Sequence, residues 1–290
     1  MNRFEIKKKF LFSCLQELNA LKPGNLNTQS ILSGMSKNKF QRAAKISAEI
    51  LTKKKISIGE SIYLSCENCI KELGENYNLG IILLCAPVVR VTMRNDFNIN
   101  NFKEQLNESL YKISIKESQM IVEAIKISKP AGLKNYKSKG DLLKSNTTSM
   151  KIFDLAKISM NYDRISRCYV SNYEEIFKLA LPYFKKQKRI FSEKISTEKL
   201  YIKLLSQDFD SHILRKFGSN TAKTVLHRSK KLIRSINDNS QKNLYYHLKK
   251  FDTYLKHMKI NPGTCADLTV TTLLIDKITD IVKFSNFNIY

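Results

Sequence analysis

Apolar residues along this chain recur at a spacing of three and four, the period of a helix that buries one face. Four segments show the pattern clearly: Phe4, Leu11, Cys14, Leu15 and Leu18; Phe40, Ala43, Ala44, Ser47, Ile50 and Leu51; Met120, Ile121, Ala124 and Ile125; and Ile176, Phe177, Ala180 and Leu181. Further helices are predicted to open at Ser196 and to span residues 219–236 and 241–258. No segment alternates with period two for long enough to indicate a sheet.

The composition agrees with a helical fold. The 290 residues are 42% apolar, enough for a globular core, and include only 9 Gly and 5 Pro. Sandwiches and barrels need many turn residues, so this scarcity favours long helices. No fixed repeat or low-complexity linker divides the chain. We therefore predict an all-α fold, with residues 1–290 forming one multi-helix globular domain.

The chain is strongly basic, with 50 Lys and Arg against 26 Asp and Glu and a formal net charge of +24. A basic face would suit nucleic acid. A codon bias toward Lys, Asn and Ile would give the same excess without any such function. The runs KKK at residues 53–55 and KKQKR at 185–189 lack interleaved aromatic residues. We therefore expect small polyanionic substrates rather than nucleic acid.

Cysteine usage and hydropathy point to a cytoplasmic protein without a membrane segment. Six scattered cysteines do not form a disulfide framework and fit reduced thiols. Cys66 and Cys69 form a CxxC with no partner pair at zinc spacing, and we expect them within a helix. The apolar part of the N-terminal stretch is too short for a signal peptide. The most apolar run, residues 79–89, is about half the length of a membrane span.

Four of the prolines mark turns, in KPGN at residues 22–25, APVVR at 86–90, KPAGL at 129–133 and NPGT at 261–264. A Pro-Gly turn at a helix boundary exposes backbone N–H groups that can bind phosphate. Any one of these turns is explained by ordinary turn chemistry. The polar neighbours shared by KPGN and NPGT, with Asp267 just after NPGT, favour a small site.

Taken in order, several motifs resemble one known family. They are ELNALKPGN (17–25), NYNLGIILLCAP (76–87), AIKISKPAGL (124–133), Asp141, MNYDRISRCY (160–169), QDFDSHILRKFG (207–218) and NPGTCADLT (261–269). This combination resembles the triphosphoribosyl-dephospho-coenzyme A synthase family over nearly the whole chain. NPGTCADLT, NLGIILLCAP and RKFG together are specific, whereas each alone would be weak.

The resemblance implies a transferase that joins ATP and 3′-dephospho-coenzyme A and releases adenine, with ATP as a substrate and Mg²⁺ bound to its triphosphate. A hydroxyl of the acceptor ribose attacks the anomeric carbon of the ATP ribose. The transition state is oxocarbenium-like, so a carboxylate can stabilise positive charge or accept the hydroxyl proton. Mg²⁺ and basic side chains suit the triphosphate.

The resemblance also implies roles for particular residues. The catalytic candidates are Asp163, Asp210 and Asp267, and the magnesium candidates are Asp141 and Asp210. The substrate-binding candidates are Lys22, Gly24, Asn25, Asn76, Asn78, Arg164, Arg167, Arg215, Lys216, Asn261, Gly263 and Thr264.

Structural explanations remain open for several of these candidates. Asp163 and Arg167 also fit an i, i+4 surface pair. Asp267 is expected in the first turn of the NPGT helix, where its charge would favour the helix dipole even without any function. The asparagines suit turns and caps.

The chain departs from the family pattern at several positions. A His and an acid after KPGN correspond to Asn27 and Gly34, and another acid corresponds to Ser118. PGGL has become PAGL at Ala131, and NTNLG has become NYNLG at Tyr77. Two further hypotheses therefore stay open. One is a related transferase with another acceptor, for instance in one-carbon pterin cofactor synthesis; the other is an inactive, basic helical binding protein. The sequence leaves the oligomeric state open.

Overall fold

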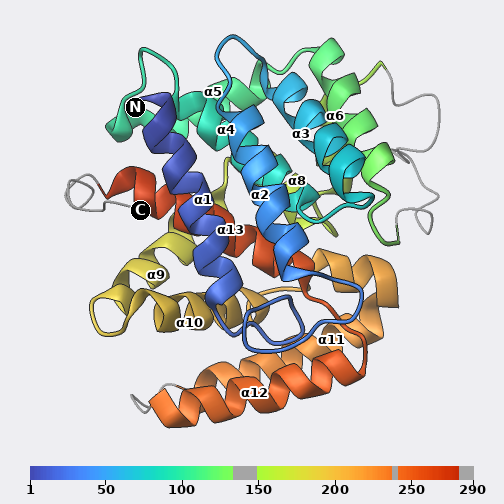
Figure 1. Ribbon diagram of the computed structural model, residues 1–290, viewed down its shortest axis with the longest axis vertical. Coiled ribbons are helices and arrows are strands. Elements are labelled where there is room, and N and C mark those ends of the chain that lie inside the picture. The colour runs from blue at the N-terminus through green and yellow to red at the C-terminus, as the bar shows by residue number, and fades with distance from the viewer. Residues whose placement is uncertain (133–148, 237–240, 281–290) are drawn as a thin grey trace.

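The structure, a computed structural model, describes residues 1–132, 149–236 and 241–280 of the chain (Figure 1). Within these ranges the chain is helical and forms no β-sheet, which confirms the all-α prediction. The helices are α1 (Arg3–Asn19), α2 (Lys37–Leu51), α3 (Ile58–Leu73), α4 (Leu79–Thr92), η1 (Ile99–Asn101), α5 (Phe102–Tyr111), α6 (Ile115–Ser128), α7 (Ile152–Ser159), α8 (Arg164–Val170), the π-helix η4 (Glu175–Ala180), α9 (Leu181–Lys188), α10 (Glu193–Leu205), α11 (Ser211–Ser235), α12 (Gln241–His257) and α13 (Gly263–Thr279).

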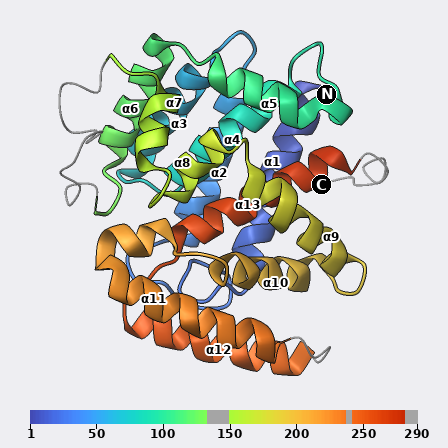
Figure 2. The ribbon, with the colours of Figure 1, turned by 180° about the vertical axis from the view of Figure 1, so that it is seen from behind.

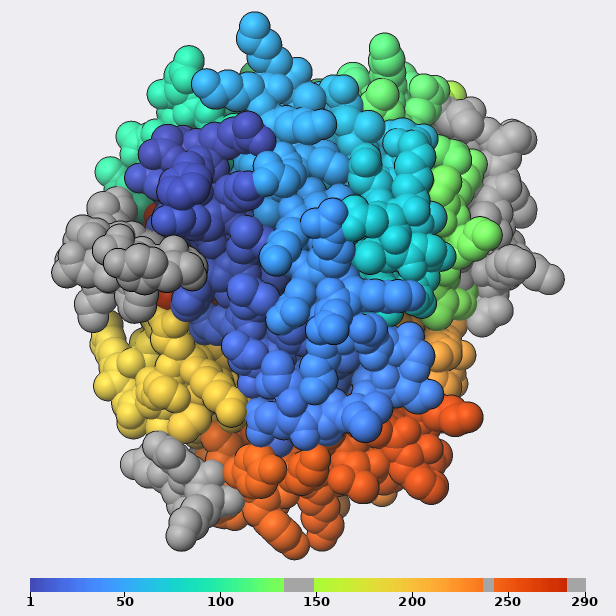
Figure 3. Space-filling model, viewed as in Figure 1, coloured from blue at the N-terminus to red at the C-terminus, as the bar shows by residue number. Residues whose placement is uncertain are grey.

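Helix α13 runs through the middle of the molecule. In Figures 1 and 2 it lies between an upper group of helices, α2 to α8, and a lower group, α9 to α12, and α1 crosses it in Figure 1. On the face drawn in Figure 3, side chains of α1 and α2 cover the centre and hide nearly all of α13. The last helix of the chain is therefore the one around which the others pack, and it contacts α1, α4, α9, α10 and α11.

Helices α4 and α13 are buried nearly all round, which is why neither shows a one-sided apolar stripe. In α13 the segment from Leu268 to Ile278 includes three threonines that a buried helix would otherwise leave unsatisfied. Each hydroxyl donates to the carbonyl four residues earlier: Thr269 to Cys265 at 2.7 Å, Thr271 to Asp267 at 2.8 Å and Thr272 to Leu268. The three threonines of this segment are thus compatible with a helix in the core.

The predicted helices are present, with local corrections. Phe40, Ala43 and Ala44 are buried as expected, and Cys66 and Cys69 lie within α3. In α1 the predicted face is partly wrong, because Phe4 and Leu15 are exposed. The buried row there is Ile6, Phe10, Cys14 and Leu18, an exact i, i+4 series that lets one ridge face the core.

Two predicted helix starts also change. The helix expected to open at Ser196 begins at Glu193, because the hydroxyl of Ser192 caps it by accepting from the N–H of Ile195 at 3.4 Å. The helix predicted over 219–236 is the second part of α11, which begins at Ser211 and is interrupted at Gly218, where φ is 82°. In the described residues no helix combines the length and apolar character needed to cross a membrane.

Candidate active site

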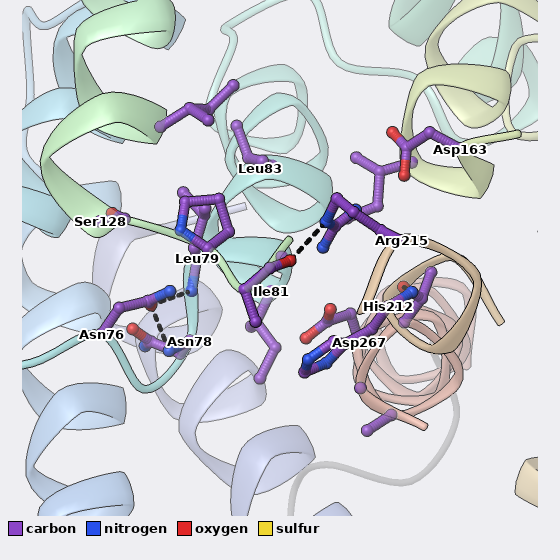
Figure 4. Close-up of a pocket in the computed structure, with 18 of the residues that line it drawn as sticks. Asn76, Asn78, Leu79, Ile81, Leu83, Ser128, Asp163, His212, Arg215 and Asp267 are labelled. Atoms are coloured by element: carbon purple, nitrogen blue, oxygen red, sulfur yellow. Dashed lines mark hydrogen bonds between the residues drawn. The ribbon is translucent and has the colours of Figure 1, made fainter. Parts of the chain in front are cut away.

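One cavity of about 1000 Å³ opens between the upper and lower groups of helices. It lies between the sides of α4, α6, α7 and α8 and the N-terminal ends of α11 and α13. Many of the residues singled out in the sequence line it: Asn25, Asn76, Asn78, Asp163, Arg215, Asn261, Gly263, Thr264 and Asp267. Figure 4 shows Asp163, Arg215, His212 and Asp267 on one side of the cavity, with Asn76 and Asn78 across from them.

Asp267 is a partly buried carboxylate on this wall. It lies in the second turn of α13 and not in the first, so a purely dipolar role for it is excluded. The carboxylate packs directly on Gly80 of α4, where a β-carbon would lie 2.0 Å from its Oδ2. It accepts no hydrogen bond from the described residues, and burial, followed by the charges of Asp210 and Glu17, raises its pKa well above 3.8. A carboxylate held without a partner at a cavity wall is an unusual and costly feature.

Asp210 lies behind this wall and joins two helix N-termini. Its Oδ1 accepts from the backbone N–H groups of His212 and Ile213, at 3.0 and 3.1 Å, and so caps α11. Its Oδ2 accepts from the N–H of Cys265 in the first turn of α13, at 2.8 Å. Asp210 is buried and does not line the cavity. This placement favours a positioning role over the catalytic or metal-binding role expected from the sequence.

The KPGN turn packs against the NPGT segment, as the shared chemistry of the two motifs suggested. Gly24 has φ of 78°, and a β-carbon there would lie 2.7 Å from the carbonyl oxygen of Ile260, so glycine is required. The Gly24 N–H is already bonded to Asp252, at 3.0 Å. Asn25 donates to the side-chain oxygen of Asn261 at 2.7 Å, and both residues line the cavity.

Lys22 has a partner inside the protein. Its ammonium group is fully buried and lies 2.7 Å from the carboxylate of Glu17, which lines the cavity. Burial lowers the pKa of Lys22 and raises that of Glu17, although each charge opposes the shift of the other. The phosphate contact predicted for Lys22 stays a prediction, because Lys22 itself does not line the cavity. Sequence reasoning did not single out Glu17, although it begins the ELNALKPGN segment.

Asp163 lines the cavity at the start of α8. It caps this helix by accepting from the backbone N–H of Ser166 at 3.0 Å and from its hydroxyl at 2.7 Å. The surface pair with Arg167 is wrong, since Arg167 instead lies 2.7 Å from Asp208. Arg164 is buried outside the cavity, paired with Glu175.

Arg215 brings a positive charge to the cavity. Its Nε donates to the carbonyl oxygen of Ala131, at 2.8 Å, so the KPAGL turn holds the guanidinium group in place. The neighbouring Lys216 is exposed over the ring of Phe217 and does not line the cavity. Of the RK pair, the structure therefore brings only Arg215 to the site.

The two asparagines of the NYNLG segment support the start of α4. Asn76 accepts from the N–H groups of Asn78 and Leu79, at 3.2 and 2.9 Å, which is the capping role left open in the sequence. Asn78 donates to the hydroxyl of Ser47 at 2.9 Å, and its own side-chain oxygen is buried without a partner among the described residues. Both line the cavity, so base or ribose recognition remains a prediction.

His212 is a cavity residue that sequence reasoning missed. Its backbone N–H donates to the hydroxyl of Thr264 as well as to Asp210, and in Figure 4 its ring lies beside Asp267. The ring Nε2 is buried with no partner among the described residues, and burial lowers the pKa of the ring. The only signal in the sequence was its place in QDFDSHILRKFG, because the four histidines show no metal spacing.

The cavity does not share the positive charge of the chain. In the described residues its charged lining consists of Glu17, Glu75, Asp163 and Asp267 against Lys129 and Arg215. Among the described residues, the lining is therefore not a focused positive cleft. The carboxylates suit a cation or a developing positive charge, and a bare triphosphate would be repelled by them.

The predicted magnesium site can be compared with the carboxylates of the described residues. They contain no group of three or more His, Cys, Asp or Glu residues arranged to hold a metal ion. Mg²⁺ is commonly held by one or two carboxylates, with phosphate and water oxygens completing the shell. The unpartnered carboxylate of Asp267 fits that pattern. Asp141, the other predicted ligand, lies outside the described residues.

Gly34 and Ser118, the two positions where the family acids are replaced, both lie outside the cavity lining. Ser118 is fully buried in α6, and its hydroxyl accepts from the N–H of Ile152 at 2.8 Å, fixing the start of α7. Asn27 is likewise buried and bonds to its own loop, accepting from the N–H of Gln29 at 2.9 Å.

The opposite wall of the cavity is made of helix sides and is aliphatic. Helices α6, α7 and α8 contribute Ile121, Ile125, Ile152, Leu155, Ala156 and Ile165. Sequence reasoning placed Ile121 and Ile125 on a buried helix face but did not distinguish a cavity wall from a core.

An all-α fold with a cavity of this size, which carries carboxylates at one end, offers a site for a small molecule. Comparisons with known proteins specify the class further. A family model described as ATP:dephospho-CoA triphosphoribosyl transferase matches residues 3–285. The fold is similar to a crystal structure from Archaeoglobus fulgidus that is provisionally described as a triphosphoribosyl-dephospho-CoA synthase. Its TM-score is 0.66 at 18% identity, over 83% of this chain and 97% of that chain. Among curated proteins, none matches.

The match over residues 3–285 shows the family: this chain belongs to the ATP:dephospho-CoA triphosphoribosyl transferases. The resemblance inferred from the sequence motifs is thereby confirmed. The likeness to the archaeal structure, at its low identity, shows the shared fold.

Proposed function

We propose that this chain transfers the triphosphoribosyl group of ATP to a ribose hydroxyl of 3′-dephospho-CoA, releasing adenine, and that Asp267 is its central catalytic residue. The observation that carries the proposal is the carboxylate of Asp267 at the cavity wall, which accepts no hydrogen bond from the described residues and lies within the field of Arg215. Family membership supports the reaction, and the placement of the carboxylate supports its site.

The chemistry requires a group that receives a proton near the anomeric carbon. The bond between C1 of the ATP ribose and adenine breaks, and a bond from C1 to the acceptor oxygen forms. The hydroxyl proton passes to Asp267 and then to the departing adenine. The ionised form of Asp267 accepts this proton, and a raised pKa makes that form the stronger base. The negative charge of the carboxylate also stabilises the oxocarbenium-like transition state.

Other cavity residues are proposed to position the substrates. Arg215 offers a fixed guanidinium group to a phosphate, which suits its planar fork. Asn25 and Asn261, bonded to each other, offer their remaining amide atoms to a ribose. Asp163 adds a second negative charge to the same end. His212 offers a buried ring nitrogen beside Asp267.

Mg²⁺ is part of the proposal, as the ion that offsets the charge of the triphosphate in a cavity with an excess of carboxylates. Among the described residues, Asp267 is the one best placed to hold it. The cytoplasmic location also belongs to the proposal. It is supported by six free, buried cysteines and by the absence of a membrane-crossing helix in the described ranges.

The test is adenine release. Purified protein is incubated with ATP, Mg²⁺ and 3′-dephospho-CoA, and free adenine and the mass of the adduct are followed by chromatography and mass spectrometry. We expect adenine only when the acceptor is present. Protein that binds ATP but releases no adenine would contradict the proposed reaction and would favour another acceptor.

A further inference from the structure

The aliphatic wall of the cavity has no role in the chemistry described so far. Ile121 and Ile125 come from α6, and Ile152, Leu155 and Ala156 come from successive turns of α7. No charged side chain interrupts these positions in the cavity lining of α6 and α7. Lys129, the residue after α6, is the charged group next to these positions in the described lining. Along the two helices the wall therefore offers dispersion contacts and the exclusion of water.

The wall is continuous with the polar end, where Asp267 lies, because both belong to the same cavity. In Figure 4 Arg215 lies between Asp163 and Asp267, and the carbonyl that holds it belongs to the turn that follows α6. A ligand that reaches from Asp267 to α6 and α7 therefore passes a fixed guanidinium group. Such a ligand has a ribose, then phosphate, then an uncharged chain.

Of the two substrates, only one has that order of groups. ATP carries its triphosphate at the end of the molecule and has no aliphatic part. Dephospho-CoA carries a pyrophosphate between its adenosine and a long pantetheine arm, which includes a dimethyl-substituted carbon. A purine ring would also tolerate aliphatic contacts, but the amide groups that read a base edge lie elsewhere, at Asn25, Asn76 and Asn261.

We propose that the wall formed by α6 and α7 binds the pantetheine arm and so selects dephospho-CoA over an adenine nucleotide that lacks the arm. This inference rests on the proposed function, of which it specifies the acceptor subsite. Burying the arm against branched aliphatic side chains supplies binding energy that a shorter acceptor cannot obtain.

The experiment compares dephospho-CoA with ADP, its counterpart without the arm, as acceptors in the adenine-release assay. For wild-type protein we expect kcat/KM to be at least about 100-fold higher with dephospho-CoA. Ile125→Ala should lower kcat/KM for dephospho-CoA about tenfold, leaving the values for ADP and the KM for ATP unchanged. Ile125→Val should give a smaller loss in the same direction, in a variant with little change in packing.

The matched control is Ile233→Ala, which truncates a partly buried isoleucine of α11 outside the cavity lining. We expect it to leave both acceptors unaffected. A rise in the KM for ATP with Ile125→Ala would place the donor base on this wall and overturn the proposal. Equal kcat/KM for the two acceptors in wild-type protein would overturn it as well.

Direct binding separates this inference from the proposed function. Dephospho-CoA and ADP are titrated into protein without ATP by isothermal calorimetry. If wild-type protein releases no adenine yet binds dephospho-CoA more tightly than ADP, and Ile125→Ala removes that preference, the proposed function fails and the arm subsite stands. Equal affinities for dephospho-CoA and ADP would overturn the subsite, whatever the activity.

Discussion

The two ends of the cavity are built in different ways. The polar end consists of helix N-termini and turns, where Asp210 joins α11 to α13 and Asn25 bonds to Asn261. The aliphatic end consists of the sides of α6 and α7, where the partly exposed Ile125 and the buried Leu155 line the cavity. We expect the first to govern the chemical step and the second to govern the choice of acceptor.

The comparison also explains why net charge is a poor guide to this site. The chain has a formal charge of +24, yet the described lining of the cavity has more carboxylates than basic groups. A positive surface steers anions toward the molecule as a whole. Inside the cavity, a cation or a cationic transition state is what the carboxylates favour.

The largest effect is expected at the polar end, from Asp267→Asn. Because the amide neither accepts the proton nor carries the charge, the rate of adenine release should fall by at least about 10³-fold, or ~4 kcal/mol. Asp154→Asn, at an exposed position of α7 outside the cavity lining, is the matched control. Turnover is measured by chromatography under saturating substrates. A fully active Asp267→Asn would refute its assignment.

A second test concerns the buried charges that support the polar end. Lys22→Met leaves the carboxylate of Glu17 buried without its partner, so we expect the free energy of unfolding to fall by about 3–4 kcal/mol. Adding Glu17→Gln should restore most of that loss, because no buried charge remains. Urea denaturation of the two variants measures the difference. If the double variant were less stable than Lys22→Met, the ion pair would not be the source of the loss.

The third test separates the two capping carboxylates. Asp210→Ala removes the acceptor for three backbone N–H groups on two helices, and should cost about 2–3 kcal/mol of stability. Asp163→Ala removes a single cap on α8 and should cost about 1 kcal/mol. Thermal unfolding of both variants shows which of the two loses more stability. Equal losses would contradict the joining role given to Asp210.

The smallest effect is one of pH. The raised pKa of Asp267 means that the folded protein favours the protonated carboxyl. As the pH rises above 3.8, the ordinary pKa of an aspartate, this residue therefore lowers the free energy of unfolding. Asp267→Asn carries no such penalty. The variant should therefore unfold at a higher temperature than wild type at about pH 8, and the gap should narrow toward about pH 5. A gap that does not depend on pH would show that the carboxylate is not desolvated.

The sequence predicts the helices better than their exposed faces. The helical spacing of apolar residues and the scarcity of Gly and Pro are enough to predict the all-α fold, because both reflect local backbone geometry. The face of α1 was partly wrong at Phe4 and Leu15, since which face is buried depends on the neighbours. The threonines of α13 suggest an exposed helix in the sequence. The structure shows that their hydroxyls donate to carbonyls of the preceding turn, so the helix can be buried.

The site was predictable where it consists of turns and unpredictable where it consists of helix sides. NPGT and its following Asp267 stand out because Pro, Gly and an acid are unusual together. The wall at Ile125 and Ala156 uses the same residue types as the core, so only the packed structure shows that it faces a cavity. Glu17 and His212 were missed because a lone acid or histidine in a helix carries no distinctive spacing.

The most direct test of the two-ended cavity is a crystal structure of the protein with dephospho-CoA bound. The account predicts the ribose hydroxyls beside Asp267, the pyrophosphate at Arg215, and the pantetheine arm against Ile125. A complex in which the arm extends into solvent, or in which the ribose lies away from Asp267, would contradict it.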